Sequence, residues 1–168
     1  MKSIVLGGGC FWCIEAVFQR VKGVSKVVSG YAGGDLESPS YENHGSHAEV
    51  AKITYDESVI KLPKLLEIFF YIHDPTTLNR QGNDVGESYR RIILCDESEL
   101  GIAQEAKKEA QNLWDDPIVT EILVLDKFNP AEDYHQNYFN QNQSNPYCQV
   151  VINPKVAKFE TKFKGFMK

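Results

Sequence analysis

The sequence contains no long hydrophobic run and no excess of positive charge. No stretch approaches the ~18 consecutive apolar residues of a membrane span, so no membrane association is expected. Only residues 4–6 are apolar before the first glycines, so no secretory signal is expected and the cytoplasm is the predicted location. With a formal net charge of −5 over 168 residues, the chain is not expected to bind nucleic acid, because phosphate affinity requires clustered cations.

Cysteines are few, and their spacing excludes several kinds of site. The four cysteines are Cys10, Cys13, Cys95 and Cys148, and a cytoplasmic chain is not expected to use them as a disulfide scaffold. A zinc site would need a second cysteine pair or histidines at ligand spacing, so no metal is expected. No Gly-Lys-Ser/Thr follows the glycine run 7–9, so no phosphate-binding loop is expected either. The cysteines should therefore be buried or redox-active, and Cys95, inside an apolar run, should be structural.

The most informative segment is residues 7–13, which read GGGCFWC after the apolar run 4–6. A helix-like apolar pattern follows, so the segment predicts a strand, a glycine turn and a helix that starts at Cys10. Unpaired N–H groups and the positive end of the helix dipole favour a thiolate at such a position. Cys13 lies three residues further on, close enough to form a disulfide with Cys10. The alternative for Cys13 is a small buried hydrophobic residue.

The order of predicted elements indicates a single domain over residues 1–168. Strands are expected at 24–31, 48–55, 91–95 and 118–125, and helices from 63 to 75, from 96 to about 113, and from 129 to about 139. This pattern favours an α+β sandwich, with a mixed sheet, a ferredoxin-like βαβ core and packed helices. A doubly wound parallel sheet is the alternative. Residues 150–168 are expected to form a C-terminal tail with an amphipathic, lysine-rich pattern.

Two further features suggest chemistry. In the predicted strand 48–55, Glu49 shares a face with Ala51, Ile53 and Tyr55. A carboxyl group on an apolar face should have a raised pKa and could act as a proton donor near neutral pH. A slipped register would instead place Glu49 in water. The second feature is the long, polar segment 79–89, which is of a kind that is often functional.

The chain resembles the type A family of peptide methionine sulfoxide reductases from residue 4 to about residue 155. The resemblance is carried by the following motifs: Gly9-Cys10-Phe11-Trp12 with Glu15, Gly30 to Gly34, Pro39-Ser40-Tyr41, Gly45 to Val50, His73 to Thr76, Arg80 to Gly86, Tyr89-Arg90, Tyr134-His135-Gln136 and Asn145 to Cys148. These motifs in this order are highly specific.

The resemblance implies a role for each residue that matches a family site. Cys10 would be the nucleophile and Glu49 the catalytic acid. Tyr41 and Tyr89 would be the two phenols that hydrogen-bond the sulfoxide oxygen, and Asp84 a polar residue of the same site. The implied activity is reduction of the S epimer of methionine sulfoxide, free or in proteins, by a monomer that needs no bound cofactor.

The resemblance also implies a substrate pocket and a recycling step. Phe11 and Trp12 would hold the S-methyl group of the substrate, with His135 nearby. Thioredoxin would be the reductant, with dithiothreitol as its substitute in vitro. Cys148 and Cys13 are the candidates for the thiol that resolves oxidised Cys10. Cys148 is favoured, because a cysteine in a mobile C-terminal segment can approach the sulfenic acid, whereas Cys13 is expected to point into the core.

Two residues depart from the family pattern beside the expected site tyrosine. Ser88 stands where glutamine is usual and Arg91 where serine is usual, so the packing of this loop is open. Two other functions remain possible from the residues alone. A thioredoxin-like thiol-disulfide oxidoreductase would explain the Cys-Phe-Trp-Cys segment, and a non-enzymatic anion-binding module would explain the glycine run before a helix.

Overall fold

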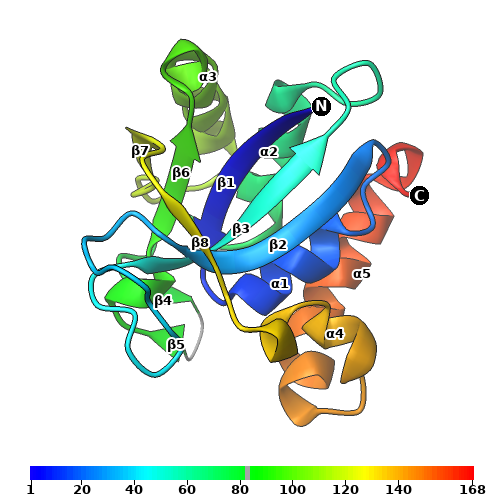
Figure 1. The fold of residues 1–168 in the computed structure, drawn as a ribbon. Helices are drawn as coiled ribbons and strands as arrows, with labels where there is room; N and C mark the ends of the chain where they lie inside the picture. Colours follow the sequence, from blue (N-terminus) through cyan, green and yellow to red (C-terminus); the bar gives the residue numbers. More distant parts are fainter. Residues whose placement is uncertain (82–83) are drawn as a thin grey trace.

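The computed structural model describes residues 1–81 and 84–168, which form a six-stranded mixed sheet with helices packed against it (Figure 1). The strands are β1 (Lys2–Gly8), β2 (Val24–Ala32), β3 (Ala48–Tyr55), β4 (Arg80–Gln81), β5 (Asp84–Val85), β6 (Arg91–Cys95), β7 (Glu121–Val124) and β8 (Phe128–Pro130). The helices are α1 (Phe11–Phe18), α2 (Leu62–Ile72), α3 (Leu100–Ala110), α4 (Tyr138–Gln141) and α5 (Asn153–Lys162).

The centre of the sheet has the predicted ferredoxin-like arrangement. The strand order is β7-β6-β1-β3-β2-β8, while β4 and β5 form a separate hairpin. β3 is antiparallel to both β1 and β2, so β1, α1 and β2 form a split βαβ unit. The alternative of a doubly wound parallel sheet is wrong, because β6 and β7 are the only parallel pair among the described strands.

The main core lies between the sheet and its helical layer, in which α1 packs on β2 and β3, α3 packs on β7, and α2 and α5 pack against each other (Figure 1). Strand side chains alternate between the faces, so Ile4 and Leu6 point into this core while Val5 joins a smaller apolar cluster on the other face. Phe128 packs against that second cluster. The sheet is therefore buried on both faces near the end of β1, where the glycine turn begins.

The predicted helix at 129–139 is wrong in its first part. Asn129 and Pro130 lie in β8, an edge strand paired with β2. An edge strand tolerates proline, because its outer side needs no N–H group for pairing. The helical residues come later, in the turn Asp133–His135 and in α4. The predicted helix 96–113 is confirmed, because the turn Glu97–Glu99 capped by Asp96, helix α3 and the turn Gln111–Leu113 follow one another without a break.

The lysine-rich C-terminal segment is folded against the helical layer. Val156 and Phe159 of α5 and the following Phe163 are buried in the main core. The ammonium group of Lys158 lies 4.4 Å from the ring centroid of Tyr71 in α2. Within the described part of the chain, no helix has the length and hydrophobicity that a bilayer crossing requires.

Candidate active site

The glycine turn places Cys10 at the N-terminus of α1, as the sequence predicts. Gly8 ends β1, and Gly9 has a φ of +99°, a conformation that favours glycine. Cys10 is extended at the N-cap position, and its carbonyl accepts the N–H of Cys13 at 3.1 Å. Space at Gly8 is tight, since an added Cβ would lie 3.1 Å from the Phe69 ring.

The thiol of Cys10 does not have the lowered pKa that the helix dipole suggests. Burial raises its pKa well above the ordinary value, and a hydrogen bond with the Cys13 side chain and the charge of Glu49 act in the same direction. The side chain is 7% exposed. The dipole argument considers only the helix, whereas the surrounding protein removes water from the sulfur. The resting thiol therefore keeps its proton.

Glu49 lies at the same place, inside the molecule. It is 1% exposed on β3, and the register pairs it with Tyr31 of β2. Its Oε1 accepts the N–H of Phe11 at 3.2 Å, so the carboxylate bonds the residue directly after Cys10. The slipped register is wrong, because Glu49 is buried together with Ala51. A buried carboxyl group thus lies beside a buried thiol.

Aromatic side chains form a cluster at the start of α1, directly after Cys10. The ring of Phe11 stacks with that of Tyr41 at a centroid distance of 6.5 Å and lies 5.1 Å from the ring of His135. The ring of Trp12 stacks on Tyr138 at 3.8 Å, with the planes 5° apart. The three residues predicted for the substrate pocket, which are Phe11, Trp12 and His135, therefore lie together, and Tyr41 contacts them.

His135 orients the indole of Trp12. The Nε1–H of Trp12 donates to Nδ1 of His135 at 3.1 Å, so Nδ1 is the acceptor and the ring proton of the neutral form is assigned to Nε2. Burial lowers the pKa of His135. The imidazole therefore stays neutral at neutral pH, which is the state that can accept the indole bond.

The structure describes only some of the site residues that were predicted in the loop 79–89. Tyr89 ends the turn Glu87–Tyr89, which packs against β3, the strand that carries Glu49. Asp84 belongs to β5, but its side chain lies outside the described part of the structure, as do Gly82 and Asn83. The role implied for Asp84 stays a prediction.

Arg91 holds this loop in a way that the sequence does not reveal. Its buried guanidinium donates to the carbonyl of Asp74 at 2.8 Å, to the carbonyl of Tyr89 at 2.9 Å and to the Thr77 hydroxyl at 2.7 Å. Burial lowers its pKa to about 10. The departure from the family pattern at this position therefore leaves Tyr89 fastened to the segment after α2.

Two buried or half-buried carboxylates were also missed. Glu15 of α1 accepts the N–H groups of Asn137 at 3.0 Å and Tyr138 at 3.2 Å, which holds α4 beside Trp12. Glu132 accepts the N–H of Tyr41 at 3.1 Å. The partners lie about a hundred residues away in the chain, and a local sequence pattern carries no signal for such pairs.

The four cysteines are all buried, and none forms a disulfide. Cys13 is hydrogen-bonded to Cys10, and its charge also raises the pKa of Cys148 in addition to the larger effect of burial. Cys148 starts the π-helical turn Cys148–Ile152, which packs against α1. The structure therefore places Cys148 in a packed turn and not in the mobile segment that the sequence suggested. Cys95 lies in β6, and burial raises its pKa to about 11.

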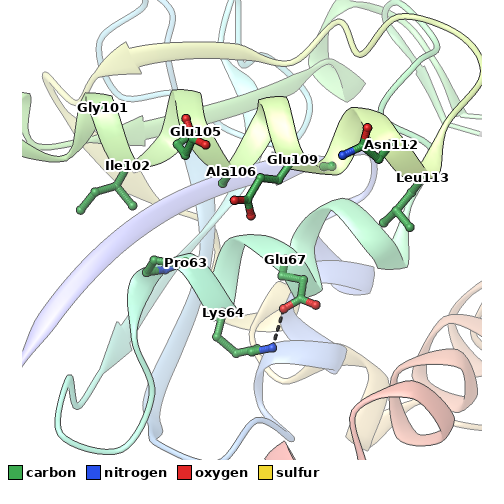
Figure 2. A pocket seen from close by; sticks show the side chains of 11 residues that line it. Pro63, Lys64, Glu67, Gly101, Ile102, Glu105, Ala106, Glu109, Asn112 and Leu113 are labelled. Atoms are coloured by element: carbon green, nitrogen blue, oxygen red, sulfur yellow. Dashed lines mark hydrogen bonds and ion pairs between the residues drawn. The ribbon is translucent and has the colours of Figure 1, made fainter.

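A groove of about 740 Å³ lies away from these residues, between α2 and α3 (Figure 2). Ile102, Ala106 and Leu113 contribute apolar surface, and Glu67 accepts a hydrogen bond from Lys64 on its lower side. None of the predicted site residues lines it. No group of histidine, cysteine or acidic side chains in the described ranges is arranged to hold a metal ion.

Comparisons with known proteins agree with this geometry. The family model for peptide methionine sulfoxide reductase matches residues 2–166. The chain is 48% identical to the peptide methionine sulfoxide reductase MsrA of Chromobacterium violaceum over 99% of both chains. It is 50% identical to the protein of that name from Saccharolobus solfataricus, over 100% of this chain and 98% of the other.

Solved structures give the same result. Reduced Mxr1 from Saccharomyces cerevisiae superposes with a TM-score of 0.80 at 34% identity, over 88% of each chain. Methionine sulfoxide reductase A of Corynebacterium diphtheriae gives a TM-score of 0.76 at 31% identity, over 86% of this chain and 76% of that one. A further structure, of Mxr1 in complex with Trx2, gives a TM-score of 0.59 at 29% identity, over 82% and 84%. The chain therefore belongs to the peptide methionine sulfoxide reductase family.

Proposed function

We propose that this chain reduces the S epimer of methionine sulfoxide, free or in proteins, with Cys10 as the nucleophile and Glu49 as the acid. The observation that carries the assignment is the bond from the Phe11 N–H to the buried Glu49 carboxyl group, which supports an acid beside the thiol. A thioredoxin-like oxidoreductase would need no such acid, and an anion-binding module would need no thiol. Family membership favours the reductase over both.

The chemistry balances as follows. The Cys10 sulfur forms a bond to the sulfoxide sulfur while Glu49 gives a proton to the sulfoxide oxygen. Tyr41 and Tyr89 donate hydrogen bonds to that oxygen as its charge develops. The oxygen leaves as water after it also takes the proton that the Cys10 thiol loses. Water then attacks the Cys10 sulfur and returns a proton to Glu49, and methionine leaves with the electron pair of the sulfur–sulfur bond. Cys10 is oxidised to a sulfenic acid and the substrate is reduced to the thioether.

The aromatic cover is suited to the substrate side chain. Phe11 and Trp12 present apolar rings beside the sulfur, which fit the S-methyl group of methionine sulfoxide. His135 keeps the indole of Trp12 in place through its Nδ1. The combination of an apolar pocket with hydrogen-bond donors at one end suits a sulfoxide, which has both properties. We assign Asp84 to the same site on the family pattern.

The resolving step has two candidate thiols, and the structure supports Cys13 for the first exchange. Its thiol is hydrogen-bonded to Cys10, and residues three apart at a helix start are within disulfide range. Condensation of the sulfenic acid with Cys13 would release water and form a disulfide. Cys148 lies beside Cys13 and is buried, so it fits a later exchange with Cys13 better than a direct attack on Cys10.

Thioredoxin is the proposed reductant. The solved complex of a related protein, Mxr1, with Trx2 supports this assignment. At about −270 mV, thioredoxin can reduce a strained or accessible disulfide. Because thiols supply both electrons, the reaction needs no bound metal, flavin or nicotinamide. We further propose a cytoplasmic monomer, and size-exclusion chromatography combined with cell fractionation would test that assignment.

An epimer-resolved assay tests the function. The protein is incubated with each epimer of N-acetyl methionine sulfoxide and dithiothreitol, and loss of sulfoxide is measured by chromatography. Turnover should be confined to the S epimer and should be abolished in Cys10→Ser, because an alcohol is a far poorer nucleophile at neutral pH. Cys95→Ser serves as the matched control, since Cys95 is also buried but lies in β6. Turnover of both epimers, or activity in Cys10→Ser, would contradict the proposal.

A further inference from the structure

Tyr41 lies in a segment without regular structure, between β2 and β3. Its side chain is 38% exposed, which is high for a group expected to bind a substrate oxygen with a fixed geometry. The ring is in contact with Phe11 and with His135, whose centroid is 4.6 Å away. Ring contacts are weakly directional, so the position of the hydroxyl also depends on how the backbone of Tyr41 is held.

The backbone of Tyr41 is held by a carboxylate that is distant in the sequence, that of Glu132. Oε2 of Glu132 accepts the N–H of Tyr41 at 3.1 Å and the hydroxyl of Tyr134 at 3.3 Å. Oε1 of the same side chain accepts the hydroxyl of Tyr31 at 3.0 Å. One carboxylate thus joins β2, the segment of Tyr41, and the turn that leads to His135.

These bonds favour the ionised carboxylate, which accepts at both oxygens. Burial acts to raise the pKa of Glu132, but hydrogen bonds from its own N–H, from the Tyr41 N–H and from the Tyr31 hydroxyl outweigh that effect and lower the pKa. The Tyr31 hydroxyl, the Tyr41 N–H and the Tyr134 hydroxyl are all donors, which matches a group that can only accept. Hydrogen bonds to an ionised group are shorter and stronger than neutral ones.

We propose that Glu132 is a positioning residue of the reaction: it fixes the Tyr41 backbone so that the Tyr41 hydroxyl meets the sulfoxide oxygen. The proposal rests on the function assigned to Tyr41 above. Glu132 acts through Tyr41 and takes no part in proton transfer. It therefore differs from Glu49, whose carboxylate bonds the residue next to the nucleophile.

A double-mutant cycle tests this role. The four proteins are the unchanged chain, Glu132→Ala, Tyr41→Phe and the double variant, each assayed with the S epimer and dithiothreitol. Glu132→Ala should lower kcat and kcat/KM together by about tenfold or more. The substitution removes the bond between the Tyr41 N–H and the charged carboxylate, and with it the position of the hydroxyl that acts in the transition state. In the Tyr41→Phe background the same substitution should cost almost nothing more, because the hydroxyl it positions is already absent.

Controls separate positioning from general damage. Glu132→Gln should recover much of the rate, since an amide oxygen can still accept the N–H of Tyr41. Asp133→Asn removes an exposed neighbouring charge and should leave the kinetics unchanged. If Glu132→Ala does not fold, the cycle is run with Glu132→Gln, where the smaller loss should again vanish in the Tyr41→Phe background.

The outcomes distinguish this inference from the proposed function. Equal losses from the Glu132 substitution with and without the Tyr41 hydroxyl would overturn the positioning role, while the function of Tyr41 would stand. A Tyr41→Phe protein with unchanged rate would remove Tyr41 from the mechanism and would overturn both. Loss of the S-epimer activity on Cys10→Ser substitution is independent of either result.

Discussion

Replacing Glu49 by glutamine is the most direct test of the acid. Glutamine has nearly the same shape, and its amide oxygen can still accept the Phe11 N–H that Oε1 accepts at 3.2 Å. The substitution therefore keeps the bond to the backbone and removes only the transferable proton. Loss of a positioned general acid costs ~10²–10⁴ in rate. We expect kcat with the S epimer to fall by that factor, with KM little changed.

The assay is a single-turnover measurement that records methionine released per enzyme, so that recycling does not limit the rate. Glu99→Gln is the matched control, because Glu99 is also a buried carboxylate that accepts a backbone N–H, that of Asp96 at 3.2 Å. Thermal melts of both variants show whether the fold is kept. If Glu49→Gln releases methionine as fast as the unchanged protein, the proton comes from another group and the acid assignment fails.

Two further predictions concern the thiols. Each variant is treated with one equivalent of sulfoxide in the absence of reductant. Cys148→Ser should still lose two free thiols in a thiol titration, whereas Cys13→Ser should keep Cys10 as a sulfenic acid that a dimedone probe labels. The reverse pattern would make Cys148 the resolving thiol. Because burial raises the pKa of Cys10, the rate of its alkylation by iodoacetamide should be slow at pH 7 and should keep rising as the pH passes the ordinary thiol pKa of about 8.5. The rate is followed on the Cys10 peptide by mass spectrometry, and a fast, pH-independent rate would show a resting thiolate.

Much of the fold could be predicted because the strongest signals are local. The glycine run before Cys10 predicts a strand, a turn and a helix start, and the structure has all three. The alternation around Glu49 predicts both the strand 48–55 and the buried face, and β3 spans those residues. Periodicity is set by which side chains face the core, so it survives in the sequence.

Other features could not be predicted because they depend on pairing between distant segments. Pro130 resembles a helix start when it is considered alone, and only its position at the edge of the sheet beside Gly30 makes it part of a strand. Glu132 and Arg91 resemble ordinary surface charges in the sequence. Their roles appear only when the chain brings Tyr41 and Tyr89 to them. Such contacts leave no periodic pattern.

The error on the Cys10 thiol has a physical cause that also bears on how the site works. A helix terminus stabilises a thiolate by a modest amount, and this effect weakens within the first turn. Removing water from the sulfur raises the pKa, and the nearby Glu49 adds to that effect. A protonated thiol is a poor target for oxidants, since the thiolate is the reactive form. We therefore expect burial to keep the resting Cys10 thiol protonated, and the proposed attack to require loss of that proton once a sulfoxide is bound.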